Sequence, residues 1–191
     1  GANEIRIKVK ANGFLDGAKH YLSFTVTTAA QATHVDQHAG SFFDRMTIEA
    51  AGSVVEQIQS YGLYNSIRNT YNCPMDKLFS NSVGAGSAGL EIEDAGDGVA
   101  GTMVKVRNGA LGEGIAAGAS KVFCIQLESG LLKNHHNKAL PDGLVELDIV
   151  LRLAGVHQAL VGATADPTYT ISNPNLYCPV YQIENGDVMA S

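Results

Sequence analysis

The sequence predicts an all-β fold, an eight-stranded antiparallel jelly-roll sandwich with a short helix and long loops. Three observations lead to this prediction. Apolar and polar residues alternate in several segments with the period of two that places successive side chains on opposite faces of a strand. Glycine, asparagine and aspartate interrupt these segments where turns are needed. Hydrophobic residues make up 45% of the 191 residues, enough for one sizeable core.

The N-terminal segments show the alternation clearly. Ile5, Ile7 and Val9 alternate with basic residues and predict a first strand with one polar face. Turns are expected at residues 12–13 (Asn-Gly) and 16–17 (Asp-Gly). Residues 21–28 predict a second strand because they are rich in β-branched and aromatic side chains, whereas the polar residues 31–40 predict a loop.

Two strands and a helix are expected next. Residues 42–50 predict a third strand, a turn follows at Gly52 and Ser53, and residues 54–58 begin a fourth strand. Apolar and aromatic residues then recur at helical spacing and stop at Pro74, which predicts a short helix within residues 61–71. The residues that carry this spacing are Leu63, Tyr64, Ile67, Arg68 and Tyr71.

The second half of the chain begins with a glycine-rich stretch. Residues 83–120 contain ten glycines and predict long loops, with a strand inside residues 99–107. Residues 121–127 predict another strand and residues 128–142 a loop. Residues 145–154 alternate cleanly and predict a strand. The last one or two strands are expected over residues 169–171 and 176–183.

Charge and cysteine content disfavour several classes of protein. The net charge is −6 and the 13 basic residues form no run, which argues against direct binding of nucleic acid. No apolar stretch approaches the ~20 residues of a membrane span. Cys73, Cys124 and Cys178 lie far apart without a Cys-x-x-Cys pair, so we expect free thiols in a reducing compartment rather than disulfides. Cys124 is expected to pack as a small hydrophobe.

Glycine and carboxylate motifs in the glycine-rich stretch do not predict a cofactor. Two glycine triplets have the spacing of the dinucleotide fingerprint, but neither lies between a strand and a helix. They are Gly84, Gly86, Gly89 and Gly96, Gly98, Gly101. The acidic cluster of the same stretch lacks the ordered spacing of a calcium loop, so a solvated acidic loop is favoured over a metal site. Its members are Glu91, Glu93, Asp94 and Asp97.

The histidines do not predict a metal centre either. His34 and His38 have helical spacing, but residues 31–40 do not predict a helix, and the best strands carry no histidine. Loop positions are therefore expected for all six: His20, His34, His38, His135, His136 and His157. Asp44 and Arg45 are interpreted as a surface pair. No catalytic, cofactor-binding or metal-binding residue is predicted, and the chain is not expected to be an enzyme.

The order of these features carries a resemblance. Residues 43–49 (Phe-Asp-Arg-Met-Thr-Ile-Glu), continued through the turn and the aromatic helix to Asn69, resemble the first jelly roll of double-jelly-roll viral major capsid proteins. Residues 123–132 with 139–141 look like the stretch before that family's penultimate strand. Residues 145–153, 169–173 and 180–183 look like the end of the same barrel. The closest likeness is to the polinton-like virus and virophage branch of the large DNA virus lineage.

The resemblance implies a structural function. It implies a major capsid protein that builds the icosahedral shell of a DNA virus as trimeric, pseudo-hexagonal capsomers. The implied partners are copies of the chain itself, neighbouring capsomers, and minor capsid, cement and penton proteins. The implied location is the virion, assembled in the reducing interior of the host cell. Residues 1–183 would form the jelly roll, and residues 184–191 would start the connector to a second one.

Other classes of function stay open at the level of sequence. One is a single-jelly-roll or minor capsid protein. A second is a carbohydrate- or receptor-binding β-sandwich module, for which Tyr61, Tyr64 and Tyr71 could supply exposed aromatic rings, although helical spacing favours packing in the core. A third, a cupin-type enzyme, is disfavoured by the lack of clustered ligands.

Overall fold

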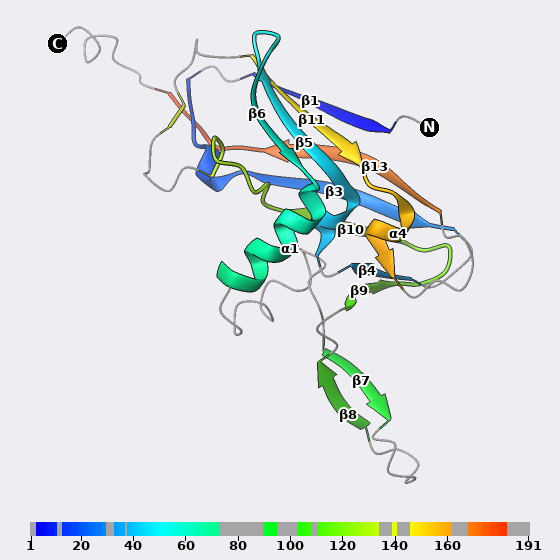
Figure 1. The fold of residues 1–191 in the computed structure, drawn as a ribbon. Coiled ribbons are helices and arrows are strands. Elements are labelled where there is room, and N and C mark those ends of the chain that lie inside the picture. Colours follow the sequence, from blue (N-terminus) through cyan, green and yellow to red (C-terminus); the bar gives the residue numbers. More distant parts are fainter. Residues whose placement is uncertain are drawn as a thin grey trace, which may run out of the picture.

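The computed structural model is an antiparallel β-sandwich of the jelly-roll type (Figure 1). It describes residues 3–10, 13–29, 33–36, 38–72, 90–94, 103–107, 111–133, 139–140, 146–161 and 168–182. Every strand pairing within these residues is antiparallel.

Two main sheets build the sandwich, and together they hold seven long strands among the described residues. The first sheet has the order β1-β11-β5-β6 and the second has the order β10-β3-β13. Strands of the first sheet are β1 (Glu4–Val9), β11 (Leu147–Leu153), β5 (Phe43–Ala50) and β6 (Ser53–Gln59). Strands of the second sheet are β10 (Ser120–Ile125), β3 (Tyr21–Thr28) and β13 (Tyr169–Tyr177).

Shorter strands extend this framework. One three-stranded sheet has the order β12-β4-β9, and β14 pairs with β2. Strands β7 and β8 form a hairpin that stands away from the sandwich in Figure 1. These strands are β12 (Leu160–Val161), β4 (Thr33–Asp36), β9 (Leu111–Ile115), β14 (Val180–Tyr181), β2 (Phe14–Leu15), β7 (Leu90–Asp94) and β8 (Met103–Arg107). The helical segments are η1 (Gly17–Lys19), η2 (Ala39–Phe42), α1 (Tyr61–Asn72) and α4 (Val156–Ala159).

One core lies between the two main sheets. Ile48 of β5 sits opposite Ile149 of β11, and Phe24 of β3 sits opposite Phe123 of β10. All four side chains are fully buried in the same hydrophobic cluster. Phe24 also packs edge-on against Phe43 of the first sheet, with ring centroids 5.3 Å apart. The contact between sheets explains why these segments alternate, because only the inward positions must be apolar.

The outer face of the first sheet is charged. Arg6 of β1 donates to Glu49 of β5 at 2.8 Å and to Asp148 of β11 at 2.9 Å, so one guanidinium spans three strands. Both carboxylates raise the pKa of Arg6. The polar residues of β1 therefore face solvent, as the alternation predicts, and Ile5, Ile7 and Val9 are the partly buried residues on the inner side.

Most predicted elements are confirmed. The strands predicted at 5–9, 21–28, 42–50, 54–58, 121–127 and 145–154 correspond to β1, β3, β5, β6, β10 and β11, and the helix corresponds to α1. The turn between β5 and β6 falls at Ala51 and Gly52, both with positive φ, one residue earlier than predicted, because Ser53 already belongs to β6. Such a turn matches the twist of the two strands it joins. The last strands are β13 and β14.

Two predictions about loops are wrong, and one segment was missed. Residues 31–40 contain β4 and η2, because Val35 is buried and β4 gains partners from β9 and β12. In the glycine-rich stretch, two further segments that were predicted to be loops are strands: β7 pairs with β8, and β9 pairs with β4. Segment α4–β12 was not predicted. Residues 184–191, the predicted connector, lie outside the described residues, so the predicted domain boundary is untested.

Candidate interaction surface

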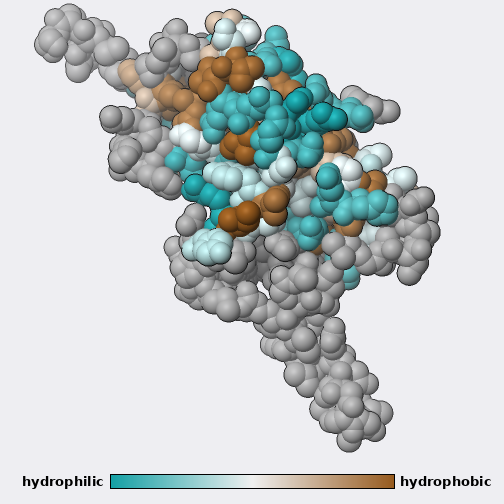
Figure 2. Space-filling model, viewed as in Figure 1, coloured by the Kyte–Doolittle hydropathy of each residue, from teal (hydrophilic) through white to brown (hydrophobic). Residues whose placement is uncertain are grey.

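Helix α1 has one buried face and one exposed apolar face. Tyr61 and Asn65, one turn apart, are buried against the sandwich, while Leu63, Ile67 and Tyr71 lie on the opposite side. The exposed fractions of these three residues are 63%, 49% and 84%. Residues spaced by four line one face of a helix, so α1 carries an exposed apolar stripe of Leu63, Ile67 and Tyr71. Figure 2 shows apolar residues at the surface over α1 and over the β5–β6 hairpin.

The start of α1 lies close to η2 because of two glycines. A Cβ atom on Gly62 would lie 3.0 Å from the Cα of Ser41, and one on Gly40 would lie 2.9 Å from the amide of Asn65. Asn65 itself donates from Nδ2 to the carbonyl of Tyr61 at 3.1 Å. The small residues therefore allow the helix to pack directly on the turn before β5.

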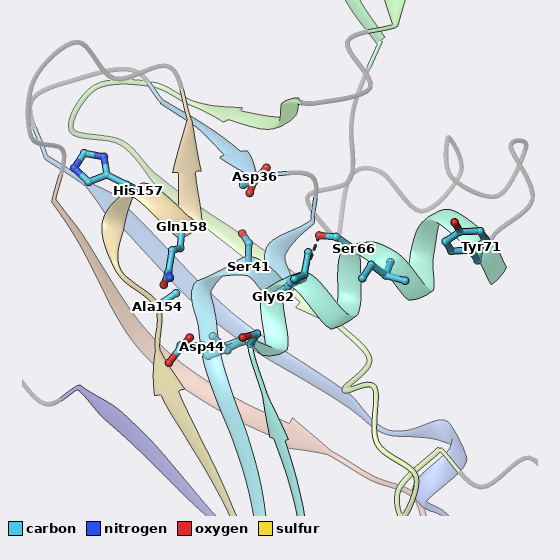
Figure 3. Close-up of a pocket in the computed structure, with 13 residues that line it drawn as sticks. Asp36, Ser41, Asp44, Gly62, Ser66, Tyr71, Ala154, His157 and Gln158 are labelled. Carbon is cyan, nitrogen blue, oxygen red and sulfur yellow. Dashed lines mark hydrogen bonds between the residues drawn. The ribbon is translucent and has the colours of Figure 1, made fainter.

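A groove of about 600 Å³ runs between α1 and the elements beside it (Figure 3). The apolar stripe of α1 forms one wall, and residues of β4 and α4 line the other side. Its lining residues are Asp36, Ser41, Phe43, Asp44, Ser60, Gly62, Leu63, Ser66, Ile67, Tyr71, Ala154, His157 and Gln158. We call this cavity the α1 groove.

Two carboxylates, Asp36 and Asp44, lie on the α1 groove. Burial raises the pKa of Asp36. Within the described part of the chain, neither side chain has a hydrogen-bond or ion-pair partner, and no described lysine or arginine lines the groove. Arg45, which was expected to pair with Asp44, instead lies 3.5 Å from Glu4, because adjacent residues of a strand point to opposite faces.

A polar network joins α1 to the segment after β10. The carboxylate of Glu56 on β6 accepts from the Ser129 hydroxyl at 2.6 Å and from the backbone N–H groups of Gly130 at 2.8 Å and Leu131 at 3.1 Å. Lys133 donates to Glu128. The Glu128 carboxylate also lies 3.2 Å from Nε of Arg68 on α1. This network fixes the segment that closes one side of the sandwich.

Two buried histidines pack near this network. Nε2 of His20 accepts from the Leu127 N–H at 2.9 Å, and Nδ1 is hydrogen-bonded to the carbonyl of Gly17, which together require a neutral imidazole. Burial lowers the pKa of His20. Nδ1 of His38 accepts from the Gly40 N–H at 2.9 Å, and burial lowers the pKa of His38 to about 4. Both rings act as structural hydrogen-bonding groups.

The structure separates the other histidines. The predicted loop positions are wrong for two of them: His34 lies in β4, and His157 lies in α4 on the α1 groove. His135 and His136 lie outside the described residues. No group of three or more histidine, cysteine, aspartate or glutamate side chains that could hold a metal ion occurs among the residues that were placed. The glycine triplets and Asp97 also fall outside the described ranges.

The tyrosines are divided between core and surface. Tyr61 is fully buried, so it cannot offer a ring to a ligand, whereas Tyr71 is exposed. Tyr64 is partly buried and accepts from Arg68 at 3.3 Å. Sequence reasoning did not identify the exposed pair Tyr21 and Tyr177, whose rings stack 4.8 Å apart. The two tyrosines are paired across β3 and β13, and no pattern within either strand indicates this pairing.

The described cysteines are free thiols. Neither Cys124 nor Cys178 forms a disulfide. Cys73 lies outside the described residues. The expectation that Cys124 packs as a small hydrophobe is wrong: its side chain is exposed, because the buried Phe123 takes the inward position next to it on β10. No described helix has the length and apolar character needed to cross a membrane.

Comparisons with known proteins give fold likenesses only. No protein-family model matches the chain, and no curated protein matches its sequence. A chain of the PBCV-1 virus capsid quasi-atomic model is similar over 94% of this chain, with 15% identity and a TM-score of 0.46. PBCV-1 VP54, fitted into a reconstruction of the virophage Sputnik, is similar over 94% with 13% identity and a TM-score of 0.46. The chain spans 38% of the length of each of these structures.

Proposed function

We propose that this chain is a structural jelly roll of a viral capsid, and more narrowly the first barrel of a major capsid protein. In this proposal three chains associate into a pseudo-hexagonal capsomer of an icosahedral DNA virus. The chain acts through contacts with copies of itself, with neighbouring capsomers, and with minor capsid, cement and penton proteins. The role is non-enzymatic, and the protein resides in the virion.

The observation that carries the proposal is the unbroken succession of β5, a tight turn, β6 and α1. Residues 43–69 are the first of the segments that carry the sequence resemblance, and they form that succession without an intervening loop. Strands β5 and β6 lie next to each other in the first sheet, and α1 follows after Ser60 alone. The resemblance thus concerns a structural unit rather than scattered positions.

The exposed apolar surface also supports a role in assembly. Besides the stripe on α1, Val54 and Val55 are exposed on β6, and Val122 is exposed on β10. Large apolar patches on a protein surface commonly mark contacts with partners. A shell protein would cover such surfaces with its neighbours, through interfaces that for obligate assemblies exceed about 2,000 Å² in total.

Expression of the complete open reading frame tests this proposal. We expect trimers by native mass spectrometry and shell-like particles by negative-stain electron microscopy. Sedimentation of the isolated 191 residues should show concentration-dependent association. A protein that remains monomeric at high concentration in both forms, without particles, would refute the capsid role.

Carbohydrate binding is the second candidate, favoured by one observation. The stacked and exposed rings of Tyr21 and Tyr177 form an aromatic surface on β3 and β13. Sugar rings can pack against such exposed aromatic faces. A glycan array probed with the chain and with a Tyr177→Ser variant tests this role, which requires a glycan signal that the variant loses.

A further inference from the structure

The α1 groove combines an exposed apolar stripe with two carboxylates. On α1, the Leu63, Ile67 and Tyr71 side chains are exposed at spacings of four residues and form an apolar wall. Two carboxylates also line the groove: Asp36 is the last residue of β4, and Asp44 lies at the start of β5. Figure 3 shows Tyr71 near the C-terminal end of α1, Asp36 at the end of β4 and Asp44 at the start of β5.

The described residues do not neutralise the two carboxylates of this groove. The described residues provide no ion-pair partner for Asp36 or Asp44, although Asp36 is partly buried. A partly buried carboxylate without a partner gains from a cation that enters the same space. The apolar stripe gains from any apolar group that removes it from water. An occupant that satisfies both walls must therefore carry apolar groups and positive charge.

The dimensions of the groove suit an extended peptide. From Leu63 to Tyr71 the helix rises about 12 Å, at roughly 1.5 Å per residue. An extended chain covers that length with about four residues, at roughly 3.3 Å each. Successive side chains of an extended chain point in opposite directions. A segment lying along the groove would thus direct alternate side chains to the apolar wall and to the carboxylates.

We infer that the α1 groove binds an extended segment of a partner protein in which apolar residues alternate with lysine or arginine. The apolar side chains pack on Leu63, Ile67 and Tyr71, and the basic side chains pair with Asp36 and Asp44. Nucleic acid is a poor occupant because its phosphates would face these carboxylates. The inference concerns a monomer surface and does not depend on the capsid role, so the two can fail separately.

Fluorescence anisotropy with labelled peptides tests the inference on the 191-residue chain. The probe is a capped Leu-Lys-Leu-Lys peptide, and the comparison probes are Leu-Glu-Leu-Glu and Ser-Lys-Ser-Lys. We expect saturable binding of the first probe and at least tenfold weaker binding of the other two. The double variant Leu63→Ser, Ile67→Ser removes two apolar side chains and should weaken binding at least about tenfold, because the lost burial of even one such side chain has an effect of that size.

Variants with equal charge changes inside and outside the groove distinguish specific binding in the groove from general attraction of a basic peptide to an acidic protein. Asp36→Asn with Asp44→Asn should weaken binding of Leu-Lys-Leu-Lys severalfold. Glu4→Gln with Glu146→Gln changes the net charge equally at exposed positions outside the groove and should not weaken binding. Val122→Ser controls for loss of an exposed apolar residue elsewhere. Circular dichroism and the urea midpoint verify that each variant is folded.

Several outcomes overturn the inference. Equal binding of the Leu-Glu peptide would remove the role of the carboxylates, and equal loss in the groove and control variants would show non-specific attraction. If no peptide binds but the groove variants abolish self-association of the chain, the occupant is a second copy. Absence of saturable binding by any probe at millimolar concentration would also reject the inference.

Discussion

The backbone N–H of Glu128 donates a hydrogen bond to the buried hydroxyl of Tyr61 at 2.7 Å. This bond joins the first turn of α1 to the segment that follows β10. Tyr61 is fully buried, and its ring is part of the hydrophobic core. Burial raises the pKa of Tyr61 above its usual range, so the hydroxyl stays neutral. One residue therefore positions both the helix and the closing segment.

Replacement of Tyr61 by phenylalanine should destabilise the protein without changing its fold. The ring still fills the core, but the buried N–H of Glu128 loses its acceptor, which costs about 1–3 kcal/mol. Urea denaturation of Tyr61→Phe measures this loss. Tyr64→Phe is the matched control, since Tyr64 is only partly buried and should lose less. Equal midpoints for wild type and Tyr61→Phe would contradict the assigned role.

Glu56→Gln should also lower stability. The Glu56 carboxylate accepts three hydrogen bonds from residues 129–131. In glutamine one of its oxygens is replaced by an amide NH2, which is a donor and cannot accept these bonds. The expected loss is about 2 kcal/mol, with faster hydrogen exchange at Gly130 and Leu131. Gln57→Ala, on the exposed side of β6, is the control. Unchanged exchange at both amides would show that the contact is dispensable.

Stability should fall as the pH is lowered from about 6.5 towards 4. Burial holds the pKa of His38 at about 4, below the value of 6.5 for an unperturbed histidine. As the pH falls, the unfolded chain therefore takes up a proton on His38 at a higher pH than the folded chain does. The contribution of the neutral, buried His38 to stability is present above about pH 6.5 and is lost as the pH falls through about 4. The shift corresponds to up to about 3 kcal/mol for His38 alone. The lowered pKa of His20 acts in the same direction.

Urea midpoints at pH 7.5 and 5 measure this dependence in the wild type and in His38→Asn. The asparagine oxygen can accept the Gly40 N–H in place of Nδ1, so the variant should fold and show a smaller difference between the two pH values. His157→Asn, at an exposed position on α4, should keep the wild-type difference. A His38→Asn variant with the full difference would assign the effect to other groups.

The two described thiols should react with alkylating reagents at different rates. Burial, together with the nearby Asp16 carboxylate, raises the pKa of Cys178 to about 11, whereas Cys124 is exposed on β10. Because the thiolate is the reactive form, Cys124 should be modified first at pH 8. Mass spectrometry of a Cys73→Ser variant after timed iodoacetamide treatment gives the order. Faster modification of Cys178 would contradict the packing around it.

The sequence by itself determined the strands whose two faces differ in environment. In β1, β3 and β11 the inward residues are apolar and most outward residues polar, so alternation identifies each strand regardless of its partners. Helix α1 was equally evident, because its apolar residues recur at spacings that only a helix brings together.

Only the tertiary structure decided β4, the α1 groove and the exposed tyrosine pair. Strand β4 is short and partly polar, and it gains its backbone hydrogen bonds from β9 and β12, which lie far along the chain. The groove forms where η2, α1 and α4 meet, so Asp36 and Leu63 become neighbours of one cavity without any shared motif. Local patterns report the environment of one segment, whereas these features depend on which distant segments pack together.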